Sequence, residues 1–249
     1  MNNFLTVGVL SLSILLVQSC VSNKVEKPKP DPKKVALINT QLAVKYMAWG
    51  NDIEAEAKLR QAIAADPTHS EANRVFALLH QKLDRNGEAN DAFLVAVQSP
   101  ENAVALYQYG RFKCGQGDES AAQLLFRQSQ AVPTFKQPWL PIAGAGECAL
   151  KNNKMQQAEQ FLRQALKLNP NYSFALLEMA DIEFRRQNYV KTDAYISRLG
   201  QVSRHSARSL WLGVQAARQI QDKNAIASYS LTLKNKFPDS KEAQLLENQ

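Results

Sequence analysis

The sequence has few of the residue types that carry catalysis and metal binding. Its 249 residues include only three histidines and three cysteines. His69, His80 and His205 are scattered, and no cysteine or carboxylate lies beside them at the spacing of metal ligands. The chain also lacks a glycine-rich phosphate-binding loop and a G-x-S-x-G nucleophile motif. These absences argue against an enzyme, against a metal or cofactor, and against a small-molecule substrate.

Long apolar runs are scarce as well. The stretch from Phe4 to Val17 has 14 uncharged, mostly apolar residues, which is too short to span a bilayer and is typical of a signal peptide. It ends in Val-Gln-Ser-Cys at positions 17–20, and this order matches the pattern cleaved by lipoprotein signal peptidase. We therefore expect residues 1–19 to be removed and the thiol of Cys20 to carry a lipid. An ordinary secretory signal or an N-terminal anchor is the alternative.

Acidic residues are scarce near both ends of a chain whose formal net charge is +7. Residues 21–35 contain five lysines and two acids, and residues 185–241 contain eleven basic residues and three aspartates. Solvated helix faces explain such a surplus, but so does an anionic partner. Aromatic residues do not alternate with the basic ones, so nucleic acid is not expected as a partner.

Residues 20–35 are rich in lysine and proline. Pro28, Pro30 and Pro32 stand at alternate positions, which disfavours a helix and favours an extended conformation. We interpret the segment as a tether that holds the following domain away from a membrane, while its lysines contact anionic head groups.

From residue 36 to residue 239 one pattern recurs six times at a spacing near 34 residues. Each copy predicts two helices that cross closely at small side chains, with a proline near the end of most copies. The small residues at the eighth position of the first helix are Ala43, Ala77, Gly110, Gly146, Ala180 and Gly213. The second helices are expected to begin near Ala55, Ala89, Ala122, Ala158, Thr192 and Ala225.

These offsets are those of the tetratricopeptide repeat, abbreviated TPR. We therefore predict an all-α, superhelical TPR solenoid over residues 36–249. The repeats are expected near 36–69, 70–103, 103–136, 139–172, 173–206 and 206–239. Two extra residues near Gln137 and Pro138 break the register between the third and fourth repeats.

The groove of such an array predicts where a protein partner docks. The second, fifth, ninth and twelfth positions of each first helix line the concave surface. In the first repeat these positions hold Leu37, Thr40, Val44 and Met47, which share one helical stripe. Because no repeat precedes this one, the stripe predicts a docking patch for an apolar or amphipathic segment. Partial burial under the tether or the second helix is the alternative.

A disulfide is expected between Cys114 and Cys148. If Cys20 is lipidated, these two cysteines remain, an even number in an oxidising compartment. They fall on the first helices of the third and fourth repeats, whose facing side chains can meet at the Cα separation that a disulfide requires. Two separate buried thiols are the alternative.

Two sequence blocks are more specific than the repeat pattern. They read ALLEMAD at 175–181 and ARSLWLG at 207–213, and the second block is followed by ASY at 227–229, LK at 233–234 and FPDS at 237–240. Together they resemble the type IV pilus biogenesis and stability lipoproteins, a TPR family also called pilotins. Val21 follows the lipid-box cysteine, so the aspartate that commonly retains lipoproteins in the inner membrane is absent.

The resemblance implies a lipoprotein on the periplasmic face of the outer membrane, held there through its lipid. It implies that the secretin subunit of the type IV pilus is the partner, and that the protein assists secretin localisation and multimerisation or stabilises pili. It implies no catalysis and no cofactor beyond the lipid on Cys20. A periplasmic scaffold for peptidoglycan enzymes, an accessory for outer-membrane protein assembly and an enzyme with a hidden site are the alternatives.

Overall fold

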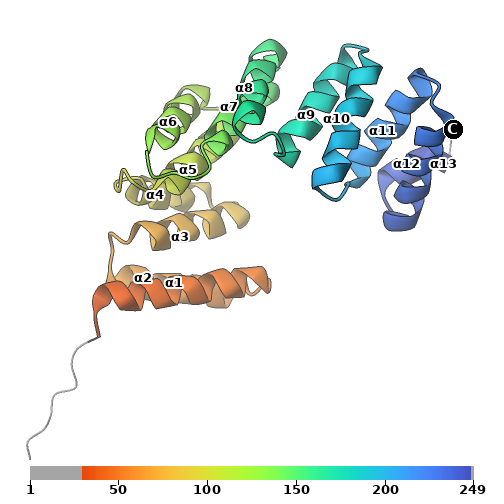
Figure 1. Ribbon diagram of the computed structural model, residues 1–249. Coiled ribbons are helices and arrows are strands. Elements are labelled where there is room, and N and C mark those ends of the chain that lie inside the picture. Colours follow the sequence, from red (N-terminus) through yellow and green to blue (C-terminus); the bar gives the residue numbers. More distant parts are fainter. Residues whose placement is uncertain (1–29, 248–249) are drawn as a thin grey trace, which may run out of the picture. The chain divides into compact units, whose positions relative to one another are not determined.

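The computed structural model describes residues 30–247, which form thirteen α-helices and contain no strand (Figure 1). The first six helices are α1 (Pro32–Ala48), α2 (Asp52–Ala65), α3 (Ser70–Lys82), α4 (Asn86–Ala96), α5 (Ala103–Gly115) and α6 (Glu119–Ala131). The remaining helices are α7 (Trp139–Lys151), α8 (Met155–Leu168), α9 (Ser173–Arg185), α10 (Tyr189–Val202), α11 (Ala207–Gln219), α12 (Lys223–Lys236) and α13 (Lys241–Glu247).

The first twelve helices form six pairs, each packed across a three-residue turn. Each pair also packs against the next one, because the second helix of a pair contacts the first helix of its successor. Along this chain of pairs the core is a series of small apolar clusters rather than one central core. The fold is therefore an all-α helical-repeat solenoid, as the sequence predicts.

The small residues predicted at the helix crossings are where close approach requires them. A Cβ atom on Gly110 would lie 2.8 Å from the ring of Phe126, and one on Gly146 would lie 3.1 Å from Leu162. Ala43 is fully buried at the same position of the first pair. The second helices begin about one turn earlier than the sequence predicted. Helix α2, for example, begins at Asp52, three residues before Ala55.

The turn inside each of the six pairs contains one residue with positive φ. Glycine occupies this position only in the first and third pairs, as Gly50 and Gly117. The other four positions hold Asp84, Asn153, Gln187 and Gln221. A left-handed residue therefore ends the first helix in every repeat, whether or not the side chain favours that conformation.

The first helix begins earlier than expected. The tether was predicted to reach residue 35, whereas α1 begins at Pro32. Proline is tolerated at the first position of a helix because its missing N–H has no partner there in any case. Residues 1–29, with most of the predicted tether, lie outside the described part of the chain.

The last helix, α13, belongs to no repeat. It packs against α11 and α12, where Ala243 joins a buried cluster with Leu210 and Leu233. The chain thus covers the exposed end of its sixth pair with a short helix of its own. Across residues 30–247, no helix combines the length and the apolar character needed to cross a membrane.

Candidate functional site

The predicted docking stripe of the first repeat is apolar and partly open. Leu37 and Val44 are 45% and 46% exposed. Met47, one turn further along α1, is half-buried and packs against the cluster that contains Ala43 and Leu59. The surface that α1 presents in the groove therefore consists mainly of Leu37 and Val44, with the edge of Met47 beside them.

Thr40 is corrected from a contact residue to a core residue. Its exposed fraction is 2%, and its hydroxyl donates a hydrogen bond to the carbonyl oxygen of Ala36 at 2.7 Å. A threonine in a helix can satisfy its hydroxyl in this way through the carbonyl four residues earlier. Position alone did not reveal this, because a buried threonine and an exposed one have the same spacing in the sequence.

The groove changes character in the middle of the array. Arg111 on α5 forms an ion pair with Glu147 on α7 at 3.2 Å, and Tyr107 and Tyr172 lie near this pair. Burial raises the pKa of Tyr107, and burial together with Tyr107 raises that of Tyr172 to about 12. Burial is the largest single influence on Arg111 and lowers its pKa, but Glu147 and the two tyrosines together favour the charge and leave the pKa of the guanidinium raised. At neutral pH this part of the groove therefore presents uncharged tyrosine hydroxyls and a guanidinium group whose positive charge is balanced by the carboxylate of Glu147.

Polar contacts of the same kind join other neighbouring first helices. Arg74 on α3 donates a hydrogen bond to Gln108 on α5 at 2.6 Å, and Arg208 on α11 donates one to Glu178 on α9 at 2.8 Å. Sequence reasoning did not identify the ion pair between Arg111 and Glu147. A signal was available, since Arg111 and Glu147 occupy the ninth position of successive first helices.

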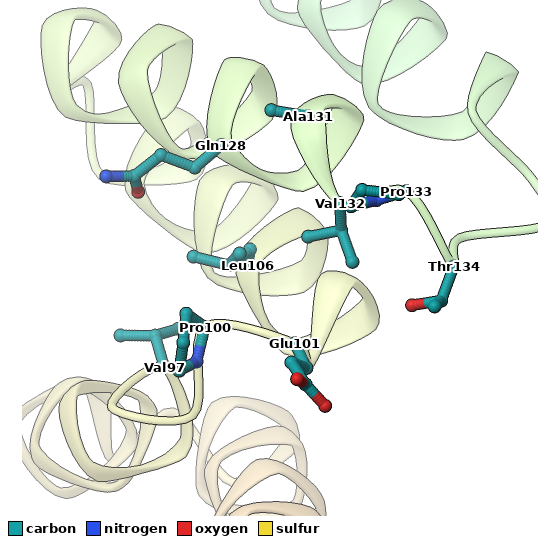
Figure 2. A pocket seen from close by; sticks show the side chains of 9 residues that line it. All are labelled: Val97, Pro100, Glu101, Leu106, Gln128, Ala131, Val132, Pro133 and Thr134. Carbon is teal, nitrogen blue, oxygen red and sulfur yellow. The ribbon is translucent and has the colours of Figure 1, made fainter.

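A cavity of about 550 Å³ lies between the turn after α4 and the end of α6 (Figure 2). Leu106 lies at its floor, Val97 and Pro100 line one side, and Val132 and Pro133 line the other. The cavity has the size of a ligand pocket, but Glu101 is the only ionisable residue among those that line it. Such a lining suits apolar contact and provides no acid–base pair.

The structure contains the disulfide predicted between Cys114 and Cys148. It joins α5 to α7, and the two Cα atoms are 5.7 Å apart. The bond lies in an apolar cluster with Phe126, and it spans the junction where residues 132–138 form a longer connection between α6 and α7.

The histidines show no catalytic arrangement. His80 is 1% exposed, stands edge-on to the ring of Phe76, and has no hydrogen-bond partner on either ring nitrogen. His205 contacts Ser209 at 3.2 Å, and burial lowers its pKa. No group of three or more potential metal ligands occurs among the described residues. Cys20, the predicted lipid site, lies outside the described range.

A known protein of similar sequence identifies the family of this chain. The type IV pilus assembly protein PilF of Pseudomonas aeruginosa is 32% identical over 206 residues, which cover 82% of this chain and 81% of PilF. The chain belongs to the PilF family. The resemblance drawn from the two sequence blocks is thereby confirmed, although no protein-family model matches the chain.

Solved structures support membership in the PilF family. PilF of Pseudomonas aeruginosa superposes with a TM-score of 0.75 at 27% identity, covering 88% of this chain and 99% of that one. PilW, described as a widely conserved type IV pilus biogenesis factor, superposes with a TM-score of 0.74 at 28% identity, covering 86% and 99%. A tetratricopeptide repeat protein from Parabacteroides merdae shares the fold alone, at 15% identity and a TM-score of 0.64.

Proposed function

We propose that this protein is a non-catalytic, lipid-anchored adaptor of type IV pilus biogenesis at the periplasmic face of the outer membrane. Its partner is the secretin subunit, whose localisation and multimerisation it assists. Membership in the PilF family supports the pilus role, and the lipid-box sequence ending in Cys20 supports the anchor. In this proposal the repeats supply recognition, the lipid supplies location, and no cofactor takes part.

The observation that carries the docking role is the open apolar pair on α1. Leu37 and Val44 are seven residues apart on one helical stripe, and each is nearly half exposed. An apolar segment laid across them would remove both side chains from water. Burying a fully exposed side chain of this kind is worth roughly 1.5–3 kcal/mol, so covering the exposed half of each gives about half of that per residue and about 1.5–3 kcal/mol for the pair.

The docking test is the double substitution L37D/V44D, with secretin binding measured on purified protein. We expect binding to fall by at least about tenfold, which corresponds to about 1.4 kcal/mol. The matched control is L124D/L168D, because Leu124 and Leu168 are exposed to a similar degree on α6 and α8. Equal binding by both folded variants would show that the partner docks elsewhere.

The anchor is tested by labelling cells with radioactive palmitate. Label should enter the wild-type protein and be absent from Cys20→Ala. A mature lipoprotein needs more than one acyl chain for stable membrane binding, so the unlabelled variant should also leave the membrane fraction. Equal labelling of both proteins would contradict lipidation at Cys20.

The role itself is tested by deleting the protein and examining SDS-resistant secretin multimers together with surface pili. Loss of both, restored by the wild type and not by L37D/V44D, is the expected result. Normal secretin multimers with altered peptidoglycan-hydrolase activity would favour a scaffold for those enzymes instead.

A further inference from the structure

Helix α1 carries a second exposed stripe beside the predicted docking stripe, whose exposed residues Leu37 and Val44 we call the groove stripe. It comprises Lys34, Ile38, Leu42, Lys45 and Trp49, at spacings of four, four, three and four residues. Ile38 and Leu42 are 46% and 36% exposed, and Trp49 is 74% exposed. We call this set the end stripe of α1.

The geometry of α1 separates the end stripe from the groove stripe. Ile38 follows Leu37 by one residue, which rotates it by about 100° around the helix. Trp49 lies just after the last helical residue, but its N–H still bonds to the carbonyl oxygen of Lys45 at 3.1 Å. Its ring also meets the ring of Tyr46 edge-on at 5.8 Å, which fixes its orientation. The stripe is therefore continuous from Lys34 to Trp49.

In most later repeats the same positions are buried; the exceptions are Phe76, which is partly buried, and Arg208, which is exposed. The position of Ile38 is taken by alanines with no exposed surface in the second, third and fifth repeats, namely Ala72, Ala105 and Ala175. The position of Leu42 is taken by residues that are at most 6% exposed in the third to sixth repeats, namely Tyr109, Ala145, Met179 and Leu212. In those repeats the preceding pair of helices covers them. In α1 apolar residues occupy both positions, Ile38 is larger than the alanines of the later repeats, and no described element precedes the helix.

The charge of α1 points to what covers the end stripe. The helix contains three lysines and no aspartate or glutamate. Lys34 and Lys45 are exposed and lie on the end stripe itself. A helix with lysines, aliphatic residues and a tryptophan on one face is typical of a helix that lies at the surface of a bilayer with anionic lipids.

The position of α1 in the chain supports the same occupant. Pro32, its first residue, follows Cys20 by only twelve positions. Even a fully extended segment of that length spans no more than about 43 Å. A lipid on Cys20 would therefore keep the start of α1 within about 43 Å of the membrane surface.

A second copy of the chain fits the end stripe less well. Three apolar side chains on one helix present far less than the roughly 800 Å² per partner of a stable interface. A symmetric pair of end stripes would also bring Lys34 and Lys45 of both copies close together, and like charges at such distances repel.

We propose that the end stripe of α1 rests on the anionic surface of the membrane that holds the lipid of Cys20. The inference extends the proposed function, since it requires the chain to be held at a membrane, and it departs from the interpretation of residues 20–35 as a tether that holds the whole domain away from that membrane. Trp49, Ile38 and Leu42 would enter the head-group region, and the two lysines would contact phosphates. The groove stripe, about 100° further around the helix, would then lie to the side of this contact and stay open to a protein partner.

The test does not depend on acylation in the cell. The mature chain from residue 20 is coupled through the Cys20 thiol to maleimide-bearing vesicles of phosphatidylethanolamine and phosphatidylglycerol, with Cys114 and Cys148 protected in their disulfide. Tryptophan emission is compared with and without lipids brominated near the head group. We expect quenching and a blue shift in the wild type, and neither in Trp49→Phe.

The matched variants are I38D/L42D and L37D/V44D, which alter the two stripes of the same helix at similar exposure. Quenching should disappear in I38D/L42D and persist in L37D/V44D, with helix content unchanged in both. Quenching that is absent from the coupled wild type, or that is equal in the two variants, overturns the proposal. If the tryptophan emission of the coupled wild type does not change and the protein forms dimers, the end stripe binds a second copy of the chain instead. Failure of palmitate labelling in cells would overturn the anchor at Cys20, and with it the membrane contact in the cell, whereas the vesicle measurement tests the affinity of the end stripe for an anionic surface by itself.

Discussion

Single residues in this array take conformations that their side chains do not favour. Gln187 and Gln221 have φ values of 61° and 58° in the turns of the fifth and sixth pairs, where the first and third pairs have glycine. A side chain in the left-handed region is strained, and glycine is not. The periodicity of the repeats therefore imposes the turn, and the residue adapts to it.

We expect Gln187→Gly and Gln221→Gly each to raise the free energy of unfolding by about 0.5–1 kcal/mol. The control is Gln164→Gly, at an exposed position inside α8, which should lower it by about 1 kcal/mol. Urea denaturation of the three variants measures both effects. A loss of stability at positions 187 and 221 as large as at 164 would contradict the turn assignment.

A second residue-scale prediction concerns His80 and pH. Burial lowers the pKa of His80 below the ordinary value of 6.5. As pH falls below that value, the unfolded chain binds a proton that the folded chain does not, so the free energy of unfolding decreases. We expect the protein to be less stable at about pH 5.5 than at about pH 7.5, and His80→Phe to lose less over this range. Part of the loss should remain, because the pKa of His205 is lowered too. An identical pH dependence in the variant would show that His80 does not contribute.

Among the elements, α5 and α7 are distinguished by a covalent link. Replacing Cys114 and Cys148 with serine should lower the free energy of unfolding by roughly 3–4 kcal/mol in the chain-entropy model. Thermal or urea denaturation measures the change, and mass spectrometry after alkylation of native protein should find no free thiol at either position. Two alkylated cysteines in protein isolated without reducing agent would refute the bridge.

The elements also show how far sequence reasoning reaches. The six helix pairs were predictable because positions such as Gly110 and Gly146 must be small for helices to cross, and this requirement repeats along the chain. Thr40 was misplaced because a hydroxyl that bonds to its own helix leaves no trace in spacing. Helix α13 was missed because it is short and obeys no period, and its burial depends on Leu210 and Leu233 in the two helices before it. The cavity beside Leu106 was missed for a similar reason, since it arises between two connections rather than within a repeat.

For the whole molecule, stability is a sum of repeats and of contacts between neighbours. Removing residues 241–249 takes α13 from Leu210 and Leu233, which it helps to bury. We expect faster amide hydrogen exchange in α11 and α12 of the truncated chain, while exchange in α3 to α8 stays unchanged. Hydrogen-exchange mass spectrometry resolves the two regions. Faster exchange along the entire array would mean that it unfolds as one unit.

The bond between Cys114 and Cys148 gives the array a mechanical asymmetry. A force applied to the two ends of a solenoid peels repeats away one after another, because each contacts only its neighbours. When the third and fourth repeats yield, the bridge closes 34 residues into a loop that cannot lengthen. That loop withholds roughly 110–120 Å of extension. Under tension the disulfide would therefore keep the residues between Cys114 and Cys148 from extending, whereas the repeats on either side could unfold to their full chain length.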